Sequence, residues 1–276
     1  MLKAIPFIIL TMYLLISCGN DDTKANEDDQ MMGKFDSIIV AQEKGPTIKY
    51  YYENMVQHIS FPSKDSLPIY ADLYESKEGP MQILLCHQAT YSKGAFINTG
   101  MVLSQLGYNA MAIDLRSGNE VNGIKNETYL KALDKGLSTD YLDAKQDIEA
   151  AIDYLFECNG GKDIILVGSS YSASLCLIIG MDNPKVKAIA AFSPGEYLEG
   201  IEVSSKLDSI MKPIFVTSSK LEISQTNQLI AKVDSTWVTH FKPSSEGVHG
   251  AKALWKETEG HKDYWMAFLQ FLKKVD

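Results

Sequence analysis

The chain has 276 residues, 45% of them hydrophobic and 22% charged, which is the composition of a globular protein with a sizeable core. Its formal net charge is −9 and no basic stripe runs through it, so nucleic acid is not expected as a partner. No internal repeat is present, and one large domain accounts for the pattern of elements that follows the N-terminal segment.

The N-terminus is typical of an export signal. Lys3 precedes an apolar run over residues 4–16 that is too short to span a membrane comfortably, and small residues follow the run. The stretch LISC, residues 15–18, resembles the lipobox of bacterial lipoproteins. This resemblance implies a signal peptide over residues 1–17, lipidation of Cys18, and anchoring in the bacterial cell envelope, at the periplasmic face or the cell surface. A plain signal peptide or an uncleaved anchor is the alternative.

The segment after the signal is polar and mostly acidic, a composition that cannot bury a core. We therefore expect the lipidated Cys18 and a flexible tether over residues 18–47, and a single domain over residues 48–276. Three further cysteines lie in or beside apolar stretches and are expected to be small buried hydrophobic residues, with a single disulfide bridge as the alternative. These are Cys86, Cys158 and Cys176.

The rest of the chain alternates apolar strands with helices. Expected strands cover residues 59–61 and 69–74, joined as a hairpin, then 81–86, 108–115, 164–167, 186–192, 214–217 and 236–241. One expected helix ends at Gly107, and a second runs from a cap at Thr139 or Asp140 to Gly160. Three more cover about residues 171–181, 225–233 and 262–274. The segment 116–138 is expected to be a long loop. This alternation predicts an α/β fold with a mainly parallel sheet covered on both faces, in which active-site residues follow the strands.

A serine-rich turn, GSSYS at residues 168–172, follows one of the expected strands. A strand-to-helix turn that exposes a serine as a nucleophile needs small residues two positions before and two positions after that serine. Ser170 satisfies this rule, since Gly168 and Ser172 flank it at those positions. Ser169 does not, because a bulky valine lies two positions before it, and Ser172 would lie inside the helix. Ser170 is the predicted nucleophile, and a polar helix cap is the alternative interpretation.

Acyl transfer by a serine also needs a base, and an acid that orients the base. On a turn of this kind both follow the nucleophile, first the acid and then a histidine. Glu222 lies in the loop after the expected strand 214–217 and is preferred over Glu196, which follows the preceding strand. His249 lies on a loop after the last expected strand and is preferred over His261, which begins the final helix.

The developing oxyanion of such a reaction needs two backbone N–H donors. Tyr171, directly after the predicted nucleophile, is expected to supply one of them. The other is expected from the loop after the strand 81–86, at Ala89 or Gln88. An ordinary strand-to-helix loop is the alternative interpretation of this segment.

These stretches, taken together and in this order, resemble the α/β-hydrolase superfamily, nearest its dienelactone-hydrolase-like branch. The resemblance runs from about residue 59 to the final helix and rests on the stretches HQA at 87–89, AIDLR at 112–116, GSSYS at 168–172, the loop with Glu222, and VHG at 248–250. It implies an eight-stranded core sheet, a Ser170–His249–Glu222 triad, no metal or other cofactor, and hydrolysis of an ester. Gln88 departs from the histidine–glycine pair of the family's oxyanion loop, and Ser172 replaces the last glycine of its elbow.

The sequence therefore predicts a lipid-anchored serine hydrolase, a carboxylesterase that acts on a small-molecule acyl substrate. The connector 195–212 is short, so no large lid is expected, and the segment 116–138 is expected to form a wall of an open site. A peptidase or thioesterase on the same scaffold remains an alternative, as does an envelope lipoprotein that binds without catalysis. Substrate identity and oligomeric state stay open.

Overall fold

The computed structural model describes residues 29–38, 52–54, 56–76 and 81–275. The expected signal peptide over residues 1–17 and the lipidation site at Cys18 lie outside the described residues, and both stay predictions. Within the described part of the chain, no helix is long and apolar enough to cross a membrane.

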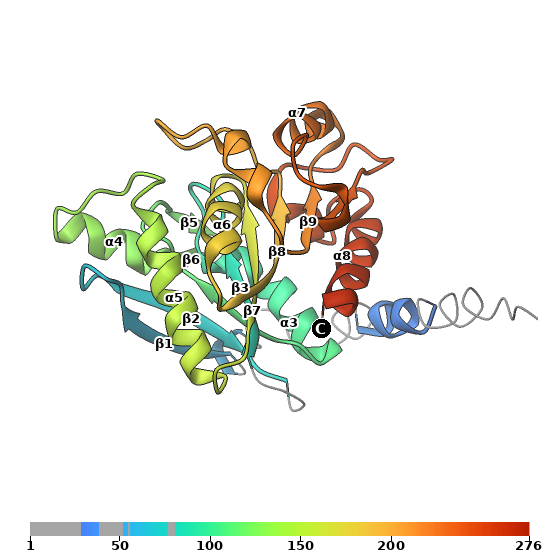
Figure 1. Ribbon diagram of the computed structural model, residues 1–276. Coiled ribbons are helices and arrows are strands. Elements are labelled where there is room, and N and C mark those ends of the chain that lie inside the picture. Colours follow the sequence, from blue (N-terminus) through green and yellow to red (C-terminus); the bar gives the residue numbers. More distant parts are fainter. Residues whose placement is uncertain (1–28, 39–51, 55, 77–80, 276) are drawn as a thin grey trace, which may run out of the picture.

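An eight-stranded sheet forms the centre of the molecule (Figure 1), in the order β1-β2-β4-β3-β7-β8-β9-β10. Its strands are β1 (Gln57–Pro62), β2 (Pro68–Tyr74), β3 (Met81–Cys86), β4 (Asn109–Ile113), β7 (Ile164–Ser169), β8 (Val186–Phe192), β9 (Ile214–Thr217) and β10 (Val238–Phe241). The β1–β2 and β2–β4 pairs are antiparallel, and all other neighbours are parallel. The predicted mainly parallel, eight-stranded sheet is thus confirmed.

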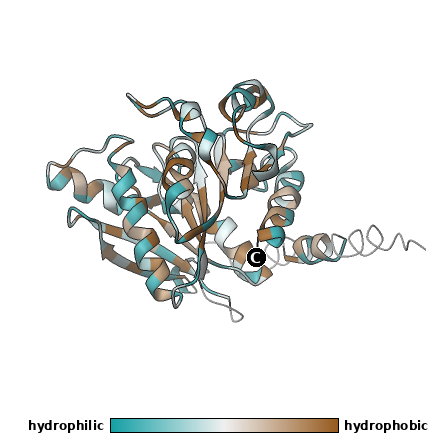
Figure 2. Cartoon of the chain, in the orientation of Figure 1, coloured by the Kyte–Doolittle hydropathy of each residue, from teal (hydrophilic) through white to brown (hydrophobic). Residues whose placement is uncertain are grey.

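Helices cover both faces of this sheet, because successive strand side chains point to opposite faces and both sets are apolar. The helices are α3 (Ile97–Leu106), α4 (Glu127–Asp134), α5 (Ala144–Cys158), α6 (Tyr171–Asp182), α7 (Ile223–Leu229) and α8 (His261–Val275). On one face α5 and α6 pack on side chains such as Ile164 and Leu166, and on the other α3 and α8 pack on Ile165 and Val167. Figure 2 shows the hydrophobic strands at the centre and hydrophilic residues on the outer sides of the helices.

Residues 29–38 differ from the expected flexible tether, because they form a helix that packs on the domain. Phe35 is fully buried, with its ring centroid 5.5 Å from that of Trp265 in α8, and Ile38 is buried in the same cluster. Most residues of the expected tether 18–47 are polar, so its composition does not reveal the short apolar stripe formed by Phe35 and Ile38. Phe35 and Ile38 are buried only through tertiary contacts with the domain, such as that of Phe35 with Trp265.

The segment 116–138 is not the long loop that was expected. It contains the short strands β5 (Glu120–Val121) and β6 (Ile124–Lys125), which pair as a hairpin, and helix α4. Asn122 and Gly123 both have positive φ, at 54° and 76°, which is the geometry of a tight Asn-Gly hairpin turn. The buried Asn126 caps α4 by accepting from the Tyr129 N–H at 2.7 Å.

Two further local expectations need correction. Helix α5 begins at Ala144 with Asp143 in the cap position, so neither Thr139 nor Asp140 caps it; a turn over residues 141–143 precedes the helix. The cysteines that the structure describes form no disulfide. Two of them, on β3 and α6, are buried as expected, but Cys158 is exposed at the end of α5.

Candidate active site

Ser170 lies at the sharp turn between β7 and α6, at the carboxyl end of the central strands. Its backbone has φ 61° and ψ −125°, a conformation that costs free energy for any residue other than glycine. A Cβ added at Gly168 would lie 2.5 Å from the Cα of Ala173, so strand and helix approach too closely for any side chain there. The turn therefore has the strained geometry of a nucleophile elbow.

Ser172, at the place of the elbow's last glycine, does more than fit beneath the turn. Its hydroxyl accepts the N–H of Ser169 at 2.9 Å and lies 2.9 Å from two carbonyl oxygens, those of Ser169 and of Cys86 at the end of β3. The side chain is fully buried. It therefore ties the turn that holds Ser170 to the strand that leads into the neighbouring loop.

We expect Ser172→Ala to lower the free energy of unfolding by about 1–3 kcal/mol, because it leaves a buried N–H and a buried carbonyl without this partner. Urea denaturation of both proteins measures the difference. Ser209→Ala, at an exposed position, is the matched control and should change stability by less than about 0.5 kcal/mol. An unchanged midpoint for Ser172→Ala would mean that the hydroxyl only fills space.

Glu222 lies directly before α7, in a short 3-10 turn capped by Ser219. Its Oε1 is hydrogen-bonded to Nδ1 of His249. Its Oε2 accepts the Ser219 hydroxyl at 2.7 Å, the Ser219 N–H at 3.1 Å and the Ser193 hydroxyl at 2.9 Å. Burial by itself raises the pKa of Glu222, but hydrogen bonds from His249 and Ser219, the Coulombic attraction of His249 and the bond from Ser193 outweigh it and lower the pKa to about 2.

This lowered pKa predicts a pH-dependent contribution to stability. Because the folded-state pKa lies below the ordinary value of 4.5, the ionised carboxylate stabilises the fold above about pH 4.5, and this contribution is lost as the pH falls toward 2. The difference in Tm between the wild type and Glu222→Gln should therefore be largest near neutral pH and shrink in acid. A difference that is independent of pH would contradict this assignment.

The two competing residues are engaged elsewhere. The Glu196 carboxylate accepts the N–H groups of Val203 and Ser204, at 2.5 and 2.9 Å, and so caps the turn that follows it. His261 begins α8, with its Nδ1 3.1 Å from the carbonyl oxygen of Thr258. The structure brings His249 together with Glu222 and leaves Glu196 and His261 in structural roles.

Two buried serine hydroxyls hold the loop of His249 against the sheet. The N–H of Gly250 donates to Ser193, after β8, at 2.9 Å, and the N–H of Ala251 donates to Ser169, at the end of β7, at 2.8 Å. Sequence reasoning missed Ser169 and Ser193 in this role. Their signal was their position, since both lie where a central parallel strand ends.

The loop after β3 is fixed by a buried histidine. His87 donates from Nδ1 to the carbonyl oxygen of Gln88 at 2.7 Å, and its Nε2 accepts the N–H of Leu115 at 2.9 Å. Burial lowers the pKa of His87 to about 4, so the ring is neutral at ordinary pH. The Gln88 side chain accepts the Ser169 hydroxyl at 3.2 Å, which joins this loop to the elbow.

The predicted oxyanion donors lie on the two elements that meet here. Tyr171 is the first residue of α6, where N–H groups have no acceptor within the helix, and Gln88 and Ala89 directly follow β3. Both Gln88 and Ala89 stay candidates for the second donor. Among the described residues, no group of three or more histidine, cysteine or acidic side chains is placed to hold a metal ion.

No protein-family model and no curated protein matches the sequence. Solved structures match the fold. The esterase Pf2001 of Pyrococcus furiosus has a TM-score of 0.64 at 16% identity, over 84% of this chain and 96% of its own. A dienelactone hydrolase of Anabaena variabilis has a TM-score of 0.58 at 15% identity, over 79% of this chain and 96% of its own. The thioesterase domain of the curacin biosynthetic pathway has a TM-score of 0.57 at 15% identity, over 80% of this chain and 100% of its own. At these identities the likeness establishes the α/β-hydrolase fold and no more.

Proposed function

We propose that this chain, which has the α/β-hydrolase fold, is a serine hydrolase that cleaves a carboxylic ester through an acyl-enzyme on Ser170. The observation that carries the proposal is the strained elbow at Ser170, with a half-buried Glu222–His249 pair that follows β9 and β10 at the carboxyl edge of the same sheet. Strain of this kind persists only where the surrounding structure maintains it, and it is a recurrent feature of catalytic turns.

In the proposed mechanism, Oγ of Ser170 attacks the carbonyl carbon while Nε2 of His249 takes the hydroxyl proton. Glu222 accepts the hydrogen bond of Nδ1, which holds the imidazole in the required tautomer and stabilises the imidazolium. The oxyanion is stabilised by the N–H of Tyr171 and that of Gln88 or Ala89. Collapse breaks the C–O bond, and the leaving alcohol takes the proton from His249. Water then repeats the sequence and releases the acid.

A fluorophosphonate probe tests this proposal, because it forms a stable adduct only with an activated serine. We expect the wild-type protein to be labelled and mass spectrometry of its peptides to place the adduct on Ser170. Comparing matched ester, thioester and amide substrates then separates an esterase from a thioesterase or a peptidase. A wild-type protein that takes no label would support the alternative of a lipoprotein that binds without catalysis.

We also propose that the protein is lipidated at Cys18 and anchored in the cell envelope. The support is the sequence pattern of residues 15–18 after a short apolar run. We expect Cys18→Ser to abolish incorporation of labelled fatty acid and to move the protein from the membrane fraction to the soluble fraction. Membrane retention that is unchanged by Cys18→Ser would count against a lipid anchor at this residue.

A further inference from the structure

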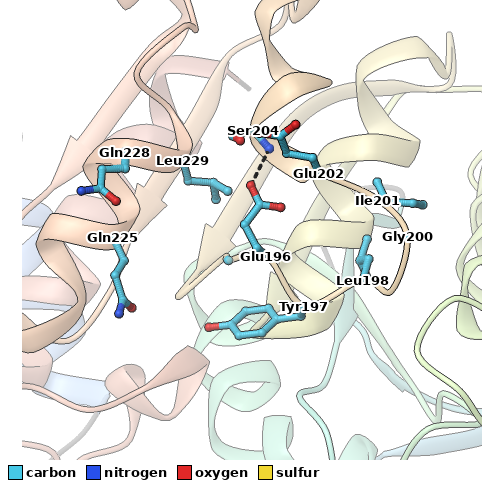
Figure 3. A pocket seen from close by; sticks show the side chains of 11 residues that line it. Glu196, Tyr197, Leu198, Gly200, Ile201, Glu202, Ser204, Gln225, Gln228 and Leu229 are labelled. Carbon is cyan, nitrogen blue, oxygen red and sulfur yellow. Dashed lines mark hydrogen bonds between the residues drawn. The ribbon is translucent and has the colours of Figure 1, made fainter.

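A cavity of about 690 Å³ lies beside the candidate active site, between the segment that follows β8 and helix α7. Figure 3 shows Gln225 and Gln228 of α7 on one side and Leu198 and Ile201 on the other. The volume is within the range of sites for small molecules. Two of its described lining residues are glutamates and none is a lysine, arginine or histidine, so it suits an uncharged group better than an anionic one.

Tyr197 belongs both to the wall of this cavity and to the surroundings of the Glu222–His249 pair. Its ring lies edge-on to that of His249, with 6.4 Å between the ring centroids, and its hydroxyl donates to the carbonyl oxygen of Ser193 at 3.4 Å. Burial and the charge of Glu222 raise the pKa of Tyr197, whereas a hydrogen-bonding interaction with Ser170 lowers it. The side chain therefore contacts His249 on one side and lines the cavity on the other.

The local backbone fixes this placement of the ring. The Tyr197 N–H donates to the Gly195 carbonyl oxygen at 3.0 Å, which folds the ring back over Gly195. A Cβ at Gly195 would lie 2.7 Å from the Tyr197 ring, so the absence of a side chain there makes room for it. Tyr197 is itself 36% exposed, so a smaller residue at this position does not open the hydrophobic core.

We propose that Tyr197 is the specificity-determining residue of this site, because its ring closes the side of the catalytic centre that faces the cavity. The protein then prefers esters whose substituent on this side is short and uncharged. The cavity becomes available to a longer aliphatic chain once the ring is removed. This proposal rests on the proposed function, since it concerns the substrate of the same serine.

The test compares chain-length profiles of the wild type, Tyr197→Ala and Tyr197→Phe. The substrates are 4-nitrophenyl esters from acetyl to octanoyl, and acetate esters of alcohols from ethanol to octanol. In at least one series, kcat/KM of the wild type should fall with chain length. Tyr197→Ala should raise the ratio of the longest to the shortest substrate at least about tenfold, since each buried methylene adds about 0.8 kcal/mol. Tyr197→Phe keeps the ring and should keep the wild-type profile.

Tyr141→Ala is the matched control. Tyr141 is also an exposed aromatic residue close to the elbow, stacked on Tyr171 with 4.3 Å between the ring centroids. It does not line the cavity. The ratio of the longest to the shortest substrate should equal that of the wild type.

The succinyl ester, which adds a carboxylate, should react at least about tenfold more slowly than the butyryl ester. Equal length profiles for the wild type and Tyr197→Ala in both series overturn the proposal, as does a Tyr197→Phe profile that matches Tyr197→Ala. If no ester is cleaved and no probe adduct forms, the proposed function itself fails.

Discussion

Replacement of Ser170 by alanine is expected to lower kcat for any ester that the wild type hydrolyses by about a millionfold, and to abolish labelling by a fluorophosphonate. The size of the effect follows from the loss of the only atom that forms the acyl-enzyme. Alanine keeps the Cβ of serine and adds no atom, so the strain of the backbone at this position is unchanged and Ser170→Ala should remain folded. Steady-state kinetics and gel-based labelling measure the two outcomes.

The neighbouring serines are the controls for this prediction. Ser169 and Ser172 lie in the same turn and are also buried, but their hydroxyls are held by the Ala251 N–H and by the end of β3. Ser169→Ala and Ser172→Ala should therefore retain labelling and lose activity only through displacement of the loops, by about tenfold to a hundredfold. If Ser170→Ala is labelled as strongly as the wild type, Ser170 is not the nucleophile.

Glu222→Gln is expected to lower kcat by about four orders of magnitude at neutral pH. The amide keeps the shape of the carboxylate, but it favours the wrong imidazole tautomer and no longer stabilises the imidazolium. Because the pKa of Glu222 is about 2, its carboxylate is ionised in the folded wild type throughout the range above about pH 4. The acid limb of the wild-type rate profile should therefore not report the titration of Glu222.

Glu196→Gln separates the two acids. Glu196 accepts two backbone N–H groups in a turn beyond the Glu222–His249 pair, so its replacement should cost less than about tenfold in kcat. The pH profile of kcat/KM for both variants is the measurement. If Glu196→Gln loses more activity than Glu222→Gln, the acid has been assigned to the wrong loop.

Much of the fold follows from short-range patterns in the sequence. The apolar runs that became β3, β7 and β8 each fill a strand buried on both faces, and Gly107 ends α3 in the left-handed conformation that glycine permits, with φ 106°. The sequence was less informative where a polar segment contains short elements. The Asn122-Gly123 turn was a readable hairpin signal, but α4 depends on Asn126, whose amide reaches back to the Leu115 carbonyl at 2.8 Å.

Some features of the candidate site can likewise be read from the local sequence, and others only from the tertiary structure. Gly168 is required because strand and helix pass within contact distance, and this constraint is visible from the local motif, as is the choice of Ser170 over Ser169. The preference for Glu222 over Glu196 rested only on chain order. The tertiary structure supplies the physical reason: His249 and Ser193 converge on one carboxylate, while the other is used as a cap.

The sequence by itself determined the α/β alternation and the elbow around Ser170, because each of these depends on residues close together in the chain. Only the tertiary structure decided that residues 29–38 pack as a helix, that Ser169 and Ser193 hold the loop of His249, and that Tyr197 contacts His249 and lines a cavity. These features depend on contacts between segments far apart in the chain. At the candidate site such contacts form because the carboxyl ends of separate strands lie at one edge of the sheet.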